Sequence, residues 1–167
     1  MTIIKQAESK DIPLINKLAE EVWFHTYSRI LSEEQQHYMF NMMYSPDALK
    51  QQMTEKHHVY FILFENDNPQ GYISVHVYEG NILYLEKIYI LPQSQGKGFG
   101  KVLLAKAEEY AKSISLDKIR LNVNRENKAS NFYKHSGYEI ISERDFHIGN
   151  GFYMNDYIMQ KQLTSNY

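Results

Sequence analysis

The sequence predicts a mixed α/β domain: a central, mostly antiparallel β-sheet flanked by helices, with a β-α-β crossover behind it. Three observations predict this class. Apolar residues recur at helical spacing through the first third of the 167-residue chain. Short apolar runs separated by turn residues follow over residues 58–91, which is typical of a β-meander. A glycine-rich loop then opens a helix, and a further strand follows that helix. We expect all of these elements to form a single domain, residues 1–167.

The first third is expected to hold a short strand and three helices. Asp11 is a favourable residue just before a helix, and Ser32 has the same place before the next helix. Pro46 suits the first turn of a third helix, because a proline there removes no helical hydrogen bond. The elements expected are the strand Ile3–Gln6, a helix that begins after Asp11, and the helices Glu33–Met43 and Asp47–Thr54.

The remainder alternates strands with helices. Asn66–Gln70 and Glu79–Asn81 carry turn residues, and Pro92 ends the longest apolar strand. Gly137 suits the position just past a helix end, where a left-handed conformation is common. The strands expected are His58–Glu65, Gly71–Tyr78, Ile82–Leu91, Lys118–Val123, Tyr138–Glu143 and Phe152–Lys161, and the helices are Gly98–Ser113 and Asn127–His135.

Composition narrows the function. The formal net charge of −2 gives no overall basic field, so we expect no nucleic-acid partner. The apolar runs are strand-sized and the first ten residues are too polar for a signal peptide, so we expect no membrane partner. The absence of cysteine excludes disulfides and thiol nucleophiles and favours a cytoplasmic location. The seven histidines show no metal-ligand spacing, so we expect no metal.

The most informative segment is Gln95–Lys101, a loop with alternate glycines that opens a helix. Glycines let an anion approach the main chain, and the first amides of a helix point outward with partial positive charge. A P-loop is excluded because neither Lys97 nor Lys101 is followed by Ser or Thr. A dinucleotide-binding turn is excluded because the spacing is Gly-x-Gly-x-Gly and the front half is antiparallel. The pattern that remains is Gln-x-x-Gly-x-Gly, Gln95–Gly100, whose main-chain amides could bind phosphate oxygens, and a helix start that merely needs glycines is the alternative.

A second pattern follows over residues 127–138, with Asn127, Ala129, Phe132-Tyr133 and Gly137-Tyr138. Together with the glycine loop it resembles the GCN5-related N-acetyltransferase (GNAT) family. Residues 85–90, 146–149 and 155–161 are similar to the PaiA-type branch of that family, which contains bacterial spermidine/spermine N-acetyltransferases.

The resemblance implies the GNAT fold, acetyl-CoA (coenzyme A) as cosubstrate and a small-molecule amine as acceptor. It also implies that the strands Ile82–Leu91 and Lys118–Val123 separate to admit the coenzyme, and it leaves a homodimer open. The coenzyme-binding residues that it implies are Ile88, Tyr89, Ile90, Gln95, Gly96, Lys97, Gly98, Phe99, Gly100, Lys101, Asn127 and Asn131.

Acetyl transfer to an amine needs a proton donor for the leaving thiolate and an acceptor for the proton of the amine. By resemblance Tyr133 is the donor, and a packed core aromatic is the alternative. Glu86 is the carboxylate inside an otherwise apolar strand, where alternation puts it on the side of Tyr84 and Ile88. We therefore expect Glu86 to accept the proton, directly or through a chain of water molecules, with a solvent-facing charge as the alternative. The substrate contacts expected are His25, Tyr27 and Tyr84.

The acceptor itself stays open at this stage. The PaiA-type resemblance implies a polyamine, but Glu33, Glu34, Glu86 and Asp156 form no dense acidic patch. Acetylation of a protein or peptide N-terminus, or of an antibiotic amine, requires the same coenzyme half. A non-catalytic acyl-CoA sensor is the alternative of another class. Because a chain without cysteine cannot form an acetyl-thioenzyme, an acetyltransferase here would use direct attack within a ternary complex.

Overall fold

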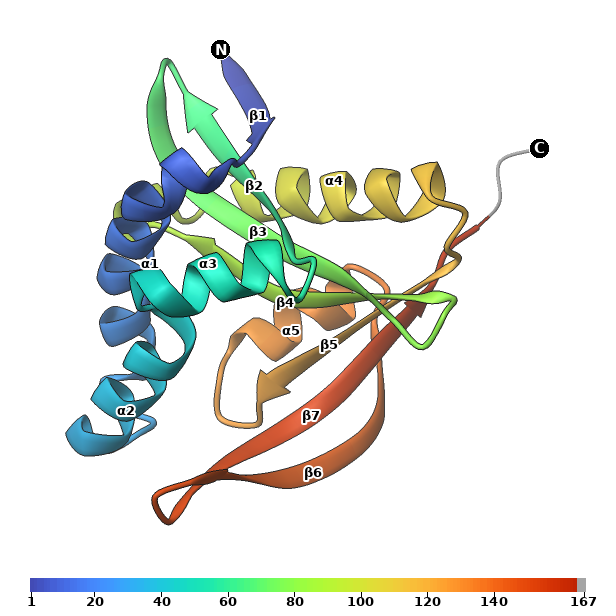
Figure 1. Ribbon diagram of the computed structural model, residues 1–167. Helices are drawn as coiled ribbons and strands as arrows, with labels where there is room; N and C mark the ends of the chain where they lie inside the picture. The colour runs from blue at the N-terminus through green and yellow to red at the C-terminus, as the bar shows by residue number, and fades with distance from the viewer. Residues whose placement is uncertain (165–167) are drawn as a thin grey trace.

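The computed structural model describes residues 1–164 and contains a seven-stranded sheet in the order β1-β2-β3-β4-β5-β7-β6. Neighbouring strands are antiparallel except β4 and β5, which are parallel and connected through α4 (Figure 1). The mixed α/β class and the β-α-β crossover predicted from the sequence are confirmed. The strands are β1 Thr2–Gln6, β2 Val59–Glu65, β3 Asn68–Tyr78, β4 Ile82–Ile90, β5 Lys118–Asn124, β6 Glu139–Gly149 and β7 Phe152–Gln162, and the helices are α1 Ile12–Tyr27, α2 Glu33–Tyr44, α3 Pro46–Thr54, α4 Phe99–Ser113 and α5 Ala129–His135.

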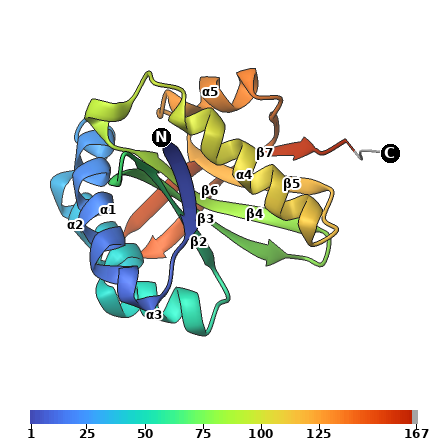
Figure 2. The same cartoon turned by 90° about the horizontal axis from the view of Figure 1, so that it is seen from above.

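Helices cover both faces of the sheet. The three N-terminal helices pack on one face, and α4 and α5 pack on the other (Figure 2). Alternation along β2 shows the two sides, because Tyr60 and Ile62 join the core under α1–α3 while Phe61 and Leu63 join the core under α4. No helix within residues 1–164 is long and apolar enough to cross a membrane.

Serine side chains cap α2 and α3. Ser32 Oγ accepts the N–H of Gln35 at 3.2 Å, and Ser45 Oγ accepts that of Ala48 at 3.2 Å. Asp11 stands just before α1, as expected, but its carboxylate accepts the N–H of Glu8 at 2.8 Å and bonds no amide of α1. The reason is a 3₁₀ turn over Ser9–Asp11, which puts the backbone of Asp11 in a helical conformation.

A β-bulge at Glu86 alters the pattern of β4. Ser74 of β3 lies opposite Lys87 and Val75 lies opposite Leu85, so Glu86 has no partner across the strand pair. Each residue after the bulge is thereby shifted to the other face. The sequence-based expectation that Glu86 and Tyr84 share a face with Ile88 is wrong, since Ile88 packs in the α4 core.

The parallel ladder between β4 and β5 is short. It pairs Ile82–Leu85 with Lys118–Leu121 and then stops, although β4 continues to Ile90 and β5 to Asn124. Beyond Leu85 the two strands therefore separate, as the family resemblance implied. The edge of β4 that faces β5 loses its strand partner at this point.

The last two strands form a hairpin that is longer than predicted. β6 extends to Gly149 instead of ending at Glu143, and it pairs with β7 along this length (Figure 1). The extension was missed because β6 is a mostly exposed edge strand, so its residues show no apolar alternation. The α5 helix begins at Ala129 instead of Asn127, and Asn127 Oδ1 accepts the N–H of Ala129 at 2.9 Å.

Candidate active site

The glycine loop presents a run of free main-chain amides. Among the hydrogen bonds of residues 1–164, none is donated by the N–H groups of Gly96 through Lys101. The first amide of α4 with a main-chain acceptor is that of Val102, which donates to Gly98 at 3.3 Å. Gly96 and Gly98 have φ of 84° and 83°, and no atom lies within 4 Å of where a Cβ would stand. The loop can therefore receive several anionic oxygens at once.

A cavity of about 1300 Å³ begins at this loop and runs along β4 to α5. It contains His25, which was expected on the acceptor side. Lys97 and Asn131 are exposed and do not line it, although the main-chain amide of Lys97 is one of the free amides of the loop. The expected coenzyme-binding residues that line the cavity are Ile88, Tyr89, Ile90, Gln95, Gly96, Gly98, Phe99, Gly100, Lys101 and Asn127.

Tyr133 lines the same cavity from α5 and is only 6% exposed. The end of α5 holds it in place, because the N–H of Tyr138 reaches back to the Tyr133 carbonyl at 3.0 Å across Gly137, whose φ is 95°. Burial, reinforced by the neighbouring phenols of Tyr27 and Tyr138, raises the pKa of Tyr133 well above its ordinary value. The hydroxyl is therefore a proton donor at neutral pH.

A second cavity, of about 720 Å³, opens on the other side of the strand separation. It is lined by α1 and α2, by β4 and β5, and by the β6–β7 hairpin. Tyr84 lines this cavity, and Glu79 and Asp156 add carboxylates to its wall. The two cavities share the side chains of Tyr27, Glu86, Lys87, Tyr89 and Asn122, so they meet where β4 leaves β5.

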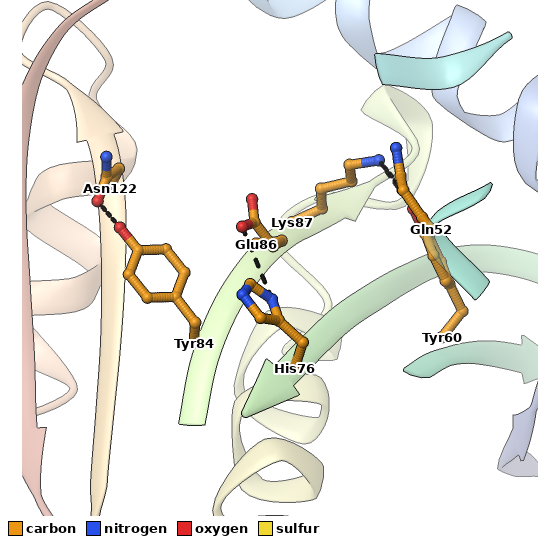
Figure 3. Close-up of polar contacts among 7 residues, drawn as sticks. All are labelled: Gln52, Tyr60, His76, Tyr84, Glu86, Lys87 and Asn122. Carbon is orange, nitrogen blue, oxygen red and sulfur yellow. Dashed lines mark hydrogen bonds and ion pairs between the residues drawn. The ribbon is translucent and has the colours of Figure 1, made fainter. Parts of the chain in front are cut away.

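Glu86 stands at this junction with His76 beside it. The nearest oxygen of Glu86 is 3.7 Å from His76 Nδ1, and the Glu86 side chain is 37% exposed (Figure 3). The ring of His58 stacks on that of His76 at 4.3 Å. Burial lowers the pKa of both imidazoles, to about 3 for His58, while Glu86 opposes the shift of His76. Both rings are therefore neutral at pH 7.

The same three side chains bring ligand atoms to within 4.8 Å of one another. A metal ion binds an imidazole nitrogen close to the plane of its ring, yet the rings of His58 and His76 are parallel to within 4°. In this arrangement the two rings cannot bind one ion together.

The model of the acetyltransferase (GNAT) domain family matches residues 28–160. The chain belongs to the GNAT family. It is accordingly an acetyl-CoA-dependent N-acetyltransferase, as the sequence patterns predicted, and the free amides of the glycine loop suit the pyrophosphate of that cosubstrate.

Among its relatives, a spermidine N(1)-acetyltransferase of Thermoplasma acidophilum is 27% identical and covers 97% of this chain and 98% of its own. The crystal structure of the PaiA N-acetyltransferase from the same organism, in complex with coenzyme A, aligns with a TM-score of 0.82 at 25% identity, over 97% of this chain and 99% of that one. The ribosomal-protein-S18-alanine N-acetyltransferase of Escherichia coli shares the fold, with a TM-score of 0.75 at 16% identity, over 100% of this chain and 97% of that one.

Sequence reasoning missed Lys87 in this GNAT site. Its Nζ donates to Tyr60 Oη at 2.8 Å and to Gln52 Oε1 at 2.9 Å (Figure 3). It also donates to the Met43 carbonyl at 3.2 Å. It also lies 4.1 Å from the centre of the Tyr44 ring. Burial lowers the pKa of Lys87 to about 7, against the pull of Glu86. Lys87 thus connects β4 to the helices above the bulge. A lysine within an apolar strand was its sequence signal.

Asn122 was also missed, because nothing in the sequence separates it from the other polar residues of β5. The Tyr84 hydroxyl donates to Asn122 Oδ1 (Figure 3), and Asn122 Nδ2 lies 3.5 Å from Asp156 Oδ2. This chain of polar groups crosses three strands, from β4 through β5 to β7. It connects the junction of the two cavities to Asp156 on the wall of the second cavity.

Proposed function

We propose that this GNAT enzyme transfers the acetyl group of acetyl-CoA to a primary amine of a small molecule by direct attack in a ternary complex. The observation that carries the proposal is the meeting of two cavities at the strand separation, with Tyr133 in one and Glu86 in both. A cosubstrate in the first cavity and an amine in the second would reach each other there without a covalent enzyme intermediate.

The main chain supplies the coenzyme contacts. The free amides of Gly96–Lys101 bind the pyrophosphate. Residues Ile88–Ile90 lie on the edge of β4 that β5 has left, so their backbone groups can pair with the amides of pantetheine as an added strand would. Asn127 stands at the start of α5, on the opposite wall of the cavity.

The two ionisable side chains divide the proton transfers between them. Glu86 takes a proton from the substrate ammonium, and the free amine then attacks the thioester carbonyl carbon. As the new C–N bond forms and the C–S bond breaks, Tyr133 gives its proton to the departing sulfur. The nitrogen loses two protons in all: the first reaches solvent through Glu86, and the second, lost after the C–N bond forms, returns to the Tyr133 phenolate, so that Tyr133 ends the cycle protonated.

The acceptor that fits best is an alkyl amine with polyamine character. Aromatic and methionine side chains line much of the second cavity, among them Tyr84, Phe146 and Met154, and such surfaces suit methylene chains and cations. The carboxylates of Glu79, Glu86 and Asp156 attract a positive charge, although Lys87, Arg120 and Arg144 also line the cavity. The similarity to a spermidine N(1)-acetyltransferase supports the same class.

A thiol-release assay with acetyl-CoA tests the proposal, with spermidine, simple monoamines and peptides with a free N-terminus as acceptors. We expect saturable turnover of small amines, spermidine included, and little turnover of peptides. Robust peptide acetylation without spermidine turnover would instead support an N-terminal acetyltransferase. Tight coenzyme binding without thiol release from any amine would support the non-catalytic sensor.

A further inference from the structure

Asp156 is a buried carboxylate that the reaction as described does not use. It lies on β7, opposite Asn124 of β5 and Arg144 of β6, and its side chain lines the acceptor cavity. Its exposed fraction is only 2%. Unlike Glu86, it lines only the second cavity, and its contact with the junction is through Asn122, which lines both cavities.

The Asp156 carboxylate accepts fewer hydrogen bonds than a buried carboxylate usually does. Within residues 1–164 its one hydrogen bond comes from Asn122 Nδ2, at 3.5 Å, which is the outer limit for such a contact. Buried carboxylates ordinarily accept several hydrogen bonds or pair with a cation. Consistent with this shortage, burial raises the pKa of Asp156 to about 6, although Asn122 and Arg125 oppose the shift.

The neighbouring cations are held by other groups. Arg125 pairs with Glu143 and Asp145, and Lys87 donates to three acceptors on the helix side. Arg120 donates to Gln160. Arg144 lies opposite Asp156 in the strand register but forms no ion pair with it in the described part of the chain. Within residues 1–164, none of these four cations thus forms an ion pair with Asp156. A cation bound in the cavity could supply that partner.

Tyr84 is influenced by two of the carboxylates that line the cavity, Glu86 and Asp156, and its hydroxyl is bonded to the same Asn122 that contacts Asp156. Burial raises its pKa, and the negative charges of Glu86 and Asp156 raise it further. Both charges are thus close enough to act on one phenol, one from the junction and one from the inner wall. An acceptor with two ammonium groups could satisfy both, whereas an acceptor with one would leave Asp156 buried and unpaired.

We propose that Asp156 binds a second ammonium group of the acceptor while the amine to be acetylated lies at Glu86, so that the enzyme selects diamines and polyamines over monoamines. The inference rests on the proposed function and defines its substrate class. Asp156 is then a specificity residue that acts on substrate affinity, and Asn122 holds its carboxylate in position.

The test compares α,ω-diamines with n-alkylamines of the same chain length, in the original enzyme and in Asp156→Asn. We expect the original enzyme to favour the diamine by about tenfold or more in kcat/KM. The variant should lose this preference through a higher KM for the diamine, with kcat at saturation and the monoamine constants nearly unchanged. Asp117→Asn makes the same charge change at the exposed start of β5 and should alter neither class.

Each contrary outcome has a distinct meaning. Equal preference for diamines and monoamines in the original enzyme would overturn the inference without any variant, so the test does not depend on the variant folding. An equal loss on both classes in Asp156→Asn would also overturn it, as would a lower melting temperature, because a structural carboxylate would destabilise the fold when removed. Absence of thiol release from every amine would instead defeat the proposed function.

Discussion

The proposed role of the Tyr133 hydroxyl as proton donor can be tested by removing that hydroxyl alone. In Tyr133→Phe the packing of α5 is kept while the proton donor is lost, so we expect kcat to fall by about 10²–10⁴-fold. Coenzyme A affinity, measured by calorimetry, should stay unchanged.

The matched control is Tyr138→Phe. This ring lies 6.0 Å from that of Tyr133, and its own hydroxyl is buried without a hydrogen-bond partner in the described residues. Its removal should leave kcat unchanged. If both variants lost the same rate, the role of Tyr133 would be packing.

Burial of Asp156 makes the free energy of unfolding depend on pH. Its pKa is about 6 in the fold against an ordinary 3.8, with Asn122, Arg125, Arg144 and Tyr84 as its polar neighbours. The favourable contribution of this group is complete below pH 3.8 and is lost as the pH rises through 6, a change of roughly 3 kcal/mol at most. Urea unfolding should therefore show Asp156→Asn to be more stable at pH 7.5, by up to about 3 kcal/mol, with most of the gain gone at pH 4. A gain that did not depend on pH would contradict this account.

Site residues that belong to a short sequence motif could be predicted from the sequence, because their neighbours in the chain identify them. The glycine loop and Tyr133 each lie within one short motif, so a role for each could be proposed from spacing and resemblance. Asn122 and Asp156 come from different strands and meet only because the β6–β7 hairpin folds back beside β5. Lys87 faces the helices because of the bulge at Glu86, which alternation cannot predict.

The side chain of Lys87 connects β4 to α2 and α3 by hydrogen bonds. Lys87→Met keeps the length of the side chain but leaves the Met43 carbonyl and Gln52 Oε1 without this donor. Both acceptors keep another donor, because Gln52 Nε2 donates to the Met43 carbonyl and the Tyr60 hydroxyl donates to Gln52 Oε1. The variant therefore loses the hydrogen bonds of the lysine without leaving either acceptor unsatisfied, and we expect urea unfolding to report a loss of about 1–2 kcal/mol. Lys50→Met, on the exposed side of α3, should cost little. Equal stability of the two variants would show that Lys87 does not hold these helices.

The entrance to α4 depends on a residue with positive φ. Gly98→Ala places a Cβ in a left-handed conformation, φ 83°, which costs about 1–2 kcal/mol of stability. The Cβ also projects beside the free amides, so coenzyme A affinity should fall about tenfold or more. Gly80→Ala in the β3–β4 turn has φ of 75° and the same open surroundings. It should lose similar stability and no affinity, and a parallel loss of affinity in both would rule out a direct role for the loop.

Elements could be assigned from the sequence where one face is buried. The amphipathic helices and the alternating strands of the meander were placed within a few residues, because burial imposes their period. The bulge in β4 and the far half of β6 were not, since an edge strand with mostly exposed residues carries no such period.

For the whole molecule, the sheet consists of two halves that share one short ladder, Ile82–Leu85 against Lys118–Leu121. Beyond Leu85 and Leu121 the two halves are no longer paired, and residues from both halves line the coenzyme cavity. A ligand that pairs with the free edge of β4 and contacts α5 would bridge the gap. Coenzyme A should therefore stabilise the molecule as a whole and not the glycine loop alone.

Saturation at 100 times Kd adds about 2.7 kcal/mol to the free energy of unfolding. For a chain of this size that corresponds to a rise of roughly 5–10 °C in melting temperature. Hydrogen exchange should slow in Glu86–Ile90 and in Asn122–Asn124, on the two sides of the gap, as well as in the loop. In Gly98→Ala at the same ligand concentration, the rise in melting temperature and the slowing of hydrogen exchange should both be smaller. Weaker binding of the pyrophosphate lowers the fraction of protein that has coenzyme A bound. Protection confined to Gly96–Lys101 would mean that the coenzyme is held at the loop without bridging the sheet, and the cavity at the strand separation would then lose its assigned role.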